Sequence, residues 1–501
     1  MSDSKAPRRA YVETYGCQMN VSDGELMEGI LAADGWTLVD APEDADVVLV
    51  NTCAIREHAE QRVLGRVGQL AGLKKDNPSL RIGVTGCMAQ RMGEALLERA
   101  DQVDLVMGPD GYRGLPGALA ALRRADASGP AAGDSLSGPA TVPTAADPDL
   151  PGSATDPGAA VPGLPGVSEA PSGSGRGRVK LSVLDLNLGE NYEGLEQRRR
   201  SGVTAWIPVQ RGCDHRCTFC IVPYVRGGEK NRRPDAVLDE VRAIAASGVT
   251  EVTLLGQTVN SYNHGGWSFP RLLAAVARVP GIRRVRFTSP HPNDVTPELV
   301  EVMAGEEAVC EQLHLPVQSG SDQVLKRMLR RYTTAAFLEK VDMVREAIPE
   351  IALSTDVIVA FPGESEEDFE ATLDLMRRVR FDDAFTYRYS PREGTPATRM
   401  PAEWFLSDDV GQARLERLIE VSRGIQASIN AGEVGRVEEV LVEKEARDPG
   451  QVLGRTRRSK VVVFDGDPSW IGTYRTVVLQ RTTGATFVGR PTDEPARVES
   501  A

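Results

Sequence analysis

Three cysteines in the segment RGCDHRCTFCIVPYVRG have a spacing that suits metal binding. Cys213, Cys217 and Cys220 are separated by three and then two residues. Thiolates are soft ligands that select iron-sulfur clusters, zinc or copper(I), and His215 between them keeps a zinc site with a fourth ligand as an alternative. A 4Fe-4S cluster held by three cysteines instead leaves one iron open, and the amine and carboxylate of S-adenosylmethionine (SAM) can chelate that iron.

Three further cysteines follow short apolar runs near the N-terminus. Cys17, Cys53 and Cys87 come after YVETYG, VVLVNT and RIGVTG, and a helical pattern follows each run. Parallel strands end together at one crest of a sheet, beside helix N-termini whose positive ends favour thiolates. We therefore expect the three thiols to converge on a second metal site, with buried structural cysteines as the alternative. The seventh cysteine, Cys310, is expected to be a small buried hydrophobe.

The elements that position these cysteines indicate an α/β fold with three domains. Residues 8–125 predict an N-terminal parallel α/β domain, and the Ala, Pro, Gly and Ser composition of 126–177 predicts a disordered linker. Residues 199–430 repeat strand and helix six times, as in a partial (β/α)6 barrel whose chemistry lies at the carboxyl ends of the strands. Residues 432–498 contain five short β runs, which favour a small all-β barrel of oligonucleotide-binding type. The barrel strands are expected near 205–210, 251–256, 284–289, 311–317, 352–359 and 384–389.

Composition narrows the possible environments. The 501 residues contain no apolar run of membrane-spanning length and no secretory start, so we expect a cytoplasmic protein with no membrane partner. The net charge of -13 disfavours general attraction to polyanions, but acidic residues gather in the linker and basic ones elsewhere, as in RTRRSK at 455–460. Local basic patches therefore remain compatible with RNA binding.

The motifs around the cysteines resemble those of the methylthiotransferase family of the radical-SAM superfamily, across nearly the whole chain outside the linker. The C-terminal barrel resembles the TRAM module of that family. Within the family, TYGCQMN, CTFCIVPY and the LLGQ-x-VNSY run are most similar to the enzymes that act on dimethylallyladenosine in tRNA. The motifs are TYGCQMN at 14–20, LVNTCAIRE at 49–57, TGCMAQR at 85–91, LLGQTVNSY at 254–262, HLPVQSGS at 314–321, LKRMLRRYT at 325–333, FPGESEEDF at 361–369 and YSPREGTPA at 389–397.

This resemblance implies two 4Fe-4S clusters, one on Cys17, Cys53 and Cys87 and one on the barrel cysteines. It implies that SAM methylates a sulfur on the first cluster and is cleaved reductively at the second, whose radical abstracts hydrogen from carbon 2 of N(6)-dimethylallyladenosine next to the anticodon. The expected partners are tRNA, an electron donor such as flavodoxin or ferredoxin, and a sulfur source, and we expect a monomer. Ser459 stands where the family leads us to expect Asn, which leaves the fine RNA contacts of the module open.

Further site residues are predicted from their positions. Phe219, Gly256, Gln257, Ser319 and Gly320 are expected to line the SAM pocket, although a core aromatic and turn glycines explain them as well. Two basic groups are expected to grip phosphates of a single-stranded anticodon loop while the base is splayed into the pocket. The first group contains Arg226, Lys230, Arg232 and Arg233, and the second contains Arg455, Arg457, Arg458 and Lys460.

Two other functions remain as alternatives. The same chemistry could act on threonylcarbamoyl-adenosine in tRNA or on an aspartate of a ribosomal protein, but those enzymes tend to carry Leu before the first Gly-Cys, where this chain has Tyr15. A non-catalytic iron-sulfur or zinc-ribbon RNA-binding protein would need no SAM pocket. The six strand-helix units and the three-cysteine spacing disfavour it.

Overall fold

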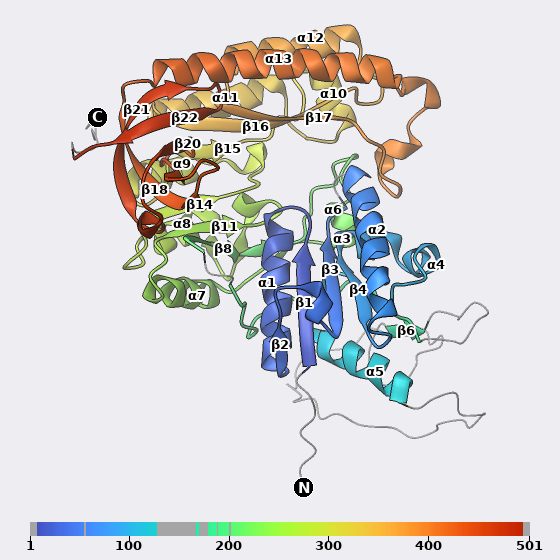
Figure 1. Ribbon diagram of the computed structural model, residues 1–501. Coiled ribbons are helices and arrows are strands. Elements are labelled where there is room, and N and C mark those ends of the chain that lie inside the picture. The colour runs from blue at the N-terminus through green and yellow to red at the C-terminus, as the bar shows by residue number, and fades with distance from the viewer. Residues whose placement is uncertain are drawn as a thin grey trace. The chain divides into compact units, whose positions relative to one another are not determined.

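The computed structural model describes residues 8–54, 57–127, 167–169, 179–187, 189–199 and 202–493. The chain divides between Arg198 and Arg199 into two compact units, which are described separately (Figure 1). Most of the linker predicted over 126–177 lies outside the described residues. Among the helices that the structure describes, none is long and apolar enough to cross a membrane.

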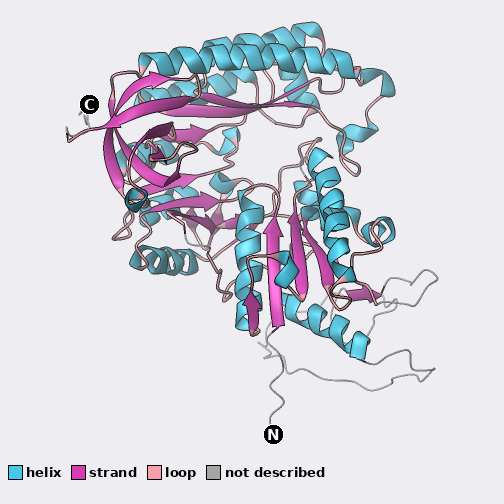
Figure 2. Cartoon of the chain, viewed as in Figure 1, coloured by secondary structure: helices cyan, strands magenta, loops and turns pink. Residues whose placement is uncertain are grey.

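The N-terminal unit is a seven-stranded sheet in the order β2-β1-β3-β4-β5-β7-β6, in which every pairing is parallel except that of β6 with β7. Helices cover both faces (Figure 2). The strands are β1 Arg8–Thr14, β2 Trp36–Leu38, β3 Val47–Thr52, β4 Arg81–Gly86, β5 Leu105–Met107, β6 Val167–Glu169 and β7 Leu181–Val183. The helices are α1 Gln18–Ala33, α2 Glu57–Gly72, α3 Cys87–Met92, α4 Ala95–Arg99 and α5 Leu115–Ala127.

The strand β3 is buried along its whole length, and its first four residues are apolar because both of its faces are covered. Along β3, Val47 and Leu49 pack with α1 and α5, while Val48 and Val50 pack with α2, α3 and α4 on the other face. This is the pattern of a parallel sheet covered on both sides. Two cores therefore hold β1, β3 and β4 side by side, and these are the three strands that lead into Cys17, Cys53 and Cys87.

The described residues 179–187 and 189–198 belong to the N-terminal unit. The strand β7 pairs with β5, the buried ring of Tyr192 stacks on Tyr112 at 5.8 Å, and a Cβ on Gly29 of α1 would lie 1.9 Å from the carbonyl oxygen of Glu196. The segment after the predicted linker thus completes the first domain before the chain enters the second.

The second unit contains six parallel strands, each followed by a helix, which confirms the predicted partial β/α barrel. The strands form two three-stranded sheets, β14-β11-β8 and β15-β16-β17. Val285 of β14 also forms a parallel bridge with Val309, which lies just before β15. The strands are β8 Thr204–Pro208, β11 Glu251–Leu255, β14 Arg284–Phe287, β15 Gln312–His314, β16 Ala352–Val359 and β17 Asp383–Arg388. The helices that follow them are α7 Pro234–Ala246, α8 Phe269–Ala277, α9 Pro297–Gly305, α11 Thr334–Ala347, α12 Glu366–Val379 and α13 Asp408–Gly432.

Short elements decorate the ends of these strands. A hairpin of β9 and β10 and the single-turn helix α6 frame the cysteine loop that follows β8. The helix α10 lies between β15 and α11, and a second hairpin of β12 and β13 precedes α8. Their bounds are β9 Gln210–Arg211, α6 Val222–Val225, β10 Lys230–Asn231, β12 Asn263–His264, β13 Trp267–Ser268 and α10 Asp322–Arg327.

The chain ends in a closed five-stranded barrel in the order β18-β19-β20-β22-β21, as predicted. Eight buried apolar side chains fill it, among them Phe464 and Phe487. The strands are β18 Val437–Glu445, β19 Gln451–Arg455, β20 Val461–Asp465, β21 Tyr474–Thr482 and β22 Thr486–Pro491.

This small barrel closes the amino end of the large one through the turn between β19 and β20. Arg284 of β14 donates to the carbonyl oxygen of Arg455 at 2.9 Å, and Arg286 donates to those of Thr456 and Arg457 at 2.8 and 2.7 Å. Both arginines are buried, and Arg286 pairs with the buried carboxylate of Glu251 at 3.1 Å. The turn carries the RTRRSK run, which therefore lies inside a protein interface.

Candidate active site

The cysteines of the N-terminal unit lie at the carboxyl ends of three adjacent strands. Thr14 of β1 pairs with Asn51 of β3, and Thr52 of β3 pairs with Gly86 of β4. Cys17 then caps α1, Cys53 directly follows β3, and Cys87 opens α3. Cys53 and Cys87 are buried and Cys17 is partly exposed. The parallel topology thus places at one edge of the sheet three cysteines that have 35 and then 33 residues between them in the sequence.

A network of buried amides underlies these thiols. The Asn20 side chain donates to the carbonyl oxygen of Thr52 at 2.9 Å, and the Asn51 side chain donates to the carbonyl oxygen of Asn20 at 2.7 Å. The Cys17 thiol lies 3.2 Å from the Asn20 side-chain oxygen, and the Thr52 hydroxyl donates to the carbonyl oxygen of Thr85 at 2.6 Å. Because every strand end is tied to its neighbour, the three cysteines are held on one rigid edge.

Two glycines allow this edge to form. A Cβ on Gly16, where φ is +137°, would lie 2.5 Å from the Cys53 Cβ. A Cβ on Gly86, where φ is +91°, would lie 2.5 Å from the Thr52 carbonyl oxygen and from the Asn51 side-chain oxygen. The donors are soft thiols with no competing carboxylate among them, so the residues fit an iron-sulfur cluster.

We expect Gly86→Ala to disrupt this edge. The left-handed conformation alone costs a non-glycine residue on the order of 1–3 kcal/mol, and the contact with Thr52 adds to that cost. Iron analysis of the purified variant should show that one cluster is lost while the barrel cluster remains. Gly65→Ala is the matched control, because a Cβ there has no atom within 4 Å and alanine favours a helix by about 0.5–1 kcal/mol. Full iron content in Gly86→Ala would contradict this account of the edge.

The barrel cysteines occupy a loop between β9 and α6. Gly212, with φ of +73°, precedes the loop, and a Cβ there would lie 1.9 Å from the Gly228 carbonyl oxygen. The Cys213 amide donates to the Gly227 carbonyl oxygen at 3.2 Å, and the Thr218 amide donates to that of Met328 at 3.1 Å. The loop is therefore fixed to the segment that follows α6 and to the end of α10.

The thiols of this loop have different neighbours. The Cys213 sulfur lies 3.1 Å from the Thr258 hydroxyl, and the Cys217 sulfur accepts a hydrogen bond from the Arg330 guanidinium at 3.4 Å. Burial raises the pKa of the Cys213 thiol, and it raises the pKa of the Cys220 thiol to about 12. A metal that binds here must displace these protons. The three soft donors fit a cluster that has three protein ligands.

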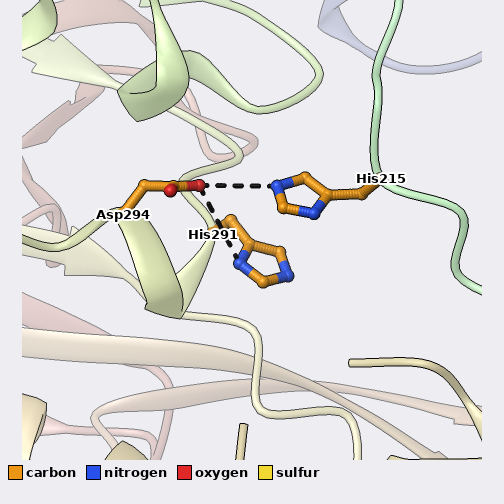
Figure 3. A group of neighbouring side chains, drawn as sticks. All are labelled: His215, His291 and Asp294. Atoms are coloured by element: carbon orange, nitrogen blue, oxygen red, sulfur yellow. Dashed lines mark ion pairs between the residues drawn. The ribbon is translucent and has the colours of Figure 1, made fainter. Parts of the chain in front are cut away.

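His215 does not join the three cysteines. Its ring stacks on His291 with the centroids 3.9 Å apart, and its Nε2 lies 3.4 Å from an oxygen of Asp294 (Figure 3). Among the described residues, His215 belongs to one group of possible metal ligands whose ligand atoms all lie within 4.8 Å of one another. The other members of this group are His291 and Asp294, and no cysteine is among them. The zinc alternative, with His215 as the fourth ligand of the cysteines, is therefore not supported.

The ring of His291 is hydrogen-bonded within its own loop and is uncharged. The amide of Asn293 donates to its Nδ1 at 3.2 Å, so that lone pair is already used. Burial, together with the charge of Arg330, lowers the pKa of His291 to about 2. The ring is neutral, and its proton is assigned to Nε2 from this hydrogen bond. The group attaches the cysteine loop to the end of β14.

Strained backbone marks the carboxyl end of the barrel. Ser289 after β14, Gln318 after β15 and Ala360 after β16 have φ values of +58°, +72° and +58°. Such residues cost on the order of 1–3 kcal/mol each and concentrate at ligand sites. Three consecutive strands thus end in a turn that redirects the chain on the side where the cysteine loop lies.

The predicted SAM-pocket residues divide into two groups. Phe219 packs edge-on against Phe361, a Cβ on Gly256 would lie 2.9 Å from the Gln210 side chain, and the buried Gln257 side-chain oxygen has no hydrogen-bond partner among the described residues. Ser319 and Gly320 instead dock on α12 through the Thr372 hydroxyl, at 3.3 and 2.9 Å. Phe219 lies within the cysteine loop and Gly256 and Gln257 directly follow β11, whereas Ser319 and Gly320 are used in packing.

Models of three protein families match this chain. They are the Uncharacterized protein family UPF0004 over residues 9–108, the Radical SAM superfamily over 207–376 and the TRAM domain over 432–487. The tRNA-2-methylthio-N(6)-dimethylallyladenosine synthase of Carboxydothermus hydrogenoformans is 39% identical over 490 residues, which are 96% of this chain and 98% of the relative. The synthase of the same name from a Thermoanaerobacter species is 41% identical over 486 residues, 96% of this chain and 92% of that one.

The chain belongs to this synthase family. The resemblance inferred from the cysteine motifs is thereby confirmed. Solved structures share the fold at low identity. The radical SAM methyltransferase TsrM of Kitasatospora setae, with cobalamin and a [4Fe-4S] cluster bound, gives a TM-score of 0.52 at 13% identity over 89% of this chain and 77% of that one. The cobalamin-dependent radical enzyme OxsB gives 0.51 at 12% identity over 84% and 58%.

The basic residues predicted to contact RNA in this member of the synthase family are mostly engaged within the protein. Arg226 and Lys230 are buried, and Arg232 pairs with Glu240 at 2.7 Å. Arg233 is exposed and pairs with Asp235. In the C-terminal group, Arg455 has the most exposed side chain, at 41%.

The other three residues of that group contact acidic partners around the turn. Arg457 pairs with Glu311 at 2.8 Å, Arg458 with Glu433 at 2.9 Å, and Lys460 with Asp382 at 2.6 Å. Their predicted role as phosphate contacts does not match this placement. The reason is physical: the charge of a basic run does not reveal whether its partner is a phosphate or a carboxylate of the same chain.

Several side chains of the site were not predicted from the sequence. Asn20 and Asn51 hold the first cysteine edge, and Thr258 and Arg330 contact the barrel thiols. All four lie within motifs that were recognised for other reasons. Polar residues beside the cysteines in otherwise apolar runs, such as Asn51 in VVLVNTC, were the available signal.

Proposed function

We propose that this chain adds a methylthio group to carbon 2 of N(6)-dimethylallyladenosine next to the anticodon of tRNA. The observation that carries the proposal is the 39–41% identity, over 96% of the chain, to synthases named for that product. Two three-cysteine sites at strand ends, in the two units of one chain, support it. A tRNA substrate favours a cytoplasmic location for this enzyme.

The assigned ligands are the six motif cysteines. Cys213, Cys217 and Cys220 hold one 4Fe-4S cluster, and Cys17, Cys53 and Cys87 hold the other. When bound, the clusters and SAM supply the electron, the radical and the methylthio group, which no side chain of this protein could provide. The chain contributes ligands, orientation and exclusion of water.

The residues around the barrel loop position SAM. The buried side-chain oxygen of Gln257 has no hydrogen-bond partner among the described residues, so a ligand with an amine or hydroxyl can satisfy it. Gln257 precedes Thr258, whose hydroxyl lies 3.1 Å from the Cys213 sulfur. Phe219 and Gly256 complete this pocket, with the ring packed on Phe361 and the glycine leaving room beside Gln210. The donor of the single electron is a low-potential protein such as flavodoxin or ferredoxin, a separate sulfur source resupplies the first site, and the enzyme acts as a monomer.

The test uses the reconstituted full-length chain with SAM and a one-electron reductant. With tRNA that carries dimethylallyladenosine, nucleoside mass spectrometry should detect the 2-methylthio product. With the same tRNA lacking the dimethylallyl group, the product should be absent or strongly reduced. Equal reaction of both, or reaction only with threonylcarbamoyl-adenosine tRNA, would refute the substrate assignment.

A further inference from the structure

Arg330 is a buried cation beside one of the barrel thiols. Its side chain is shielded from solvent, and the residue is 6% exposed. One guanidinium nitrogen donates to the Cys217 sulfur at 3.4 Å, and a second donates to the Pro316 carbonyl oxygen at 3.1 Å. The third donates to the Tyr332 hydroxyl at 3.1 Å. Every nitrogen of the group therefore has a defined partner, and one of these partners is sulfur.

This guanidinium forms no ion pair with a carboxylate of the described residues. Burying a charge without an opposite charge costs several kcal/mol, so buried cations in proteins are normally paired. The neighbouring His291 is neutral, because burial and the charge of Arg330 lower its pKa to about 2. The local protein thus leaves the positive charge of Arg330 uncompensated.

The backbone is strained on both sides of Arg330. Leu329 and Arg331 have φ values of +56° and +58°, which cost non-glycine residues on the order of 1–3 kcal/mol each. Both of these neighbours are exposed, whereas Arg330 between them is buried. The two left-handed residues direct one arginine of a basic run inward and leave the other outside.

We propose that Arg330 is a positioning residue that sets the reduction potential of the barrel cluster through the Cys217 sulfur. This inference rests on the proposed function, in which Cys217 is a cluster ligand. A 4Fe-4S cluster with three thiolates carries a net negative charge, which supplies the missing partner of Arg330. One electron from a low-potential donor makes the cluster more negative by one unit. A buried positive charge and a hydrogen bond to sulfur stabilise that reduced state and so raise the potential.

The test measures the potential directly. The full-length chain with Cys17, Cys53 and Cys87 all replaced by alanine contains only the barrel cluster, so its electron paramagnetic resonance signal can be titrated with Ti(III) citrate without interference. In this background, Arg330→Gln should bind the same amount of iron. At a fixed potential, its ratio of reduced to oxidised cluster should be at least tenfold smaller, which is a fall of about 59 mV for a one-electron couple.

Two further variants separate charge from packing. Arg331→Gln removes the adjacent, exposed arginine and should leave the potential unchanged. Arg330→Lys keeps a positive charge but not the planar guanidinium, and it should give an intermediate potential. If Arg330→Gln does not bind iron, the reduction potential of Arg330→Lys tests the proposal in its place.

The outcomes distinguish the two levels of the proposal. Unchanged potentials in all Arg330 variants that load iron would overturn the role of Arg330 and leave the cluster assignment intact. Failure of the parent chain to bind iron at the barrel cysteines would instead refute the proposed function. An equal fall in Arg331→Gln would show that general surface charge sets the potential, which also overturns the inference.

Discussion

Replacing Cys217 with alanine should reduce methylthio transfer to the uncatalysed background. The change removes one of three ligands from the barrel loop, and no side chain near it could take over the chemistry of the cofactors. Enzymatic rate enhancements of at least ~10⁶-fold depend on such chemistry, so the loss should be complete within the range of most assays. The measurements are formation of 5′-deoxyadenosine from SAM and of methylthio-adenosine in tRNA, together with iron content. The variant should retain the iron held by Cys17, Cys53 and Cys87.

Cys310→Ala is the matched control for this result. Cys310 is also a buried cysteine of the barrel, and burial raises the pKa of its thiol. It packs beside Arg286 and Glu251 at the opposite, amino end of the strands. Its replacement should leave both clusters and the activity in place. Reductive cleavage of SAM by Cys217→Ala at the wild-type rate would contradict the assignment of the barrel site.

Replacing Arg284 with alanine should destabilise the second unit by about 3–5 kcal/mol, the range expected when a buried ion pair loses one partner. Arg284 is 1% exposed and donates to the carbonyl oxygens of Arg455 and Glu439. Without it, these acceptors and the buried Glu251 lose a partner at the junction of the two barrels. Chemical denaturation of the purified full-length chain should show the loss, and limited proteolysis should release the C-terminal barrel earlier.

The adjacent arginine offers a control that differs in little except burial. Arg283 has a side chain that is 51% exposed, and it pairs with Glu439 at 2.7 Å. Exposed pairs contribute about 0–1 kcal/mol, so Arg283→Ala should unfold almost as the wild type does. Similar losses in the two variants would show that the turn between β19 and β20 does not fix the small barrel to the large one.

The sheet edge that carries Cys17, Cys53 and Cys87 could be predicted because its signal lies in short stretches of the sequence. Each cysteine lies directly after an apolar run, and parallel strands of one sheet place their carboxyl ends together. The six barrel strands were predicted for the same reason, and β16 occupies 352–359 as expected. The closed C-terminal barrel follows from five short runs separated by turn residues.

Contacts between segments far apart in the sequence could not be predicted in this way. The run at 455–460 has the composition of a phosphate-binding surface, but it meets Glu311 and Asp382, more than 70 residues earlier in the chain. Arg330 and Arg331 are identical in type and adjacent. Only the left-handed turns at positions 329 and 331 decide which of them reaches Cys217. Such turns have no glycine signature in this sequence, so the buried arginine was hidden among solvated ones.

The most direct test of the central claim is nucleoside mass spectrometry of tRNA from a strain that lacks this gene, with rescue by the wild-type chain or by Cys217→Ala. We expect that 2-methylthio-dimethylallyladenosine disappears in the deletion strain, that dimethylallyladenosine accumulates, and that only the wild-type chain restores the product. Persistence of the methylthio nucleoside in the deletion strain, or its restoration by Cys217→Ala, would contradict the account.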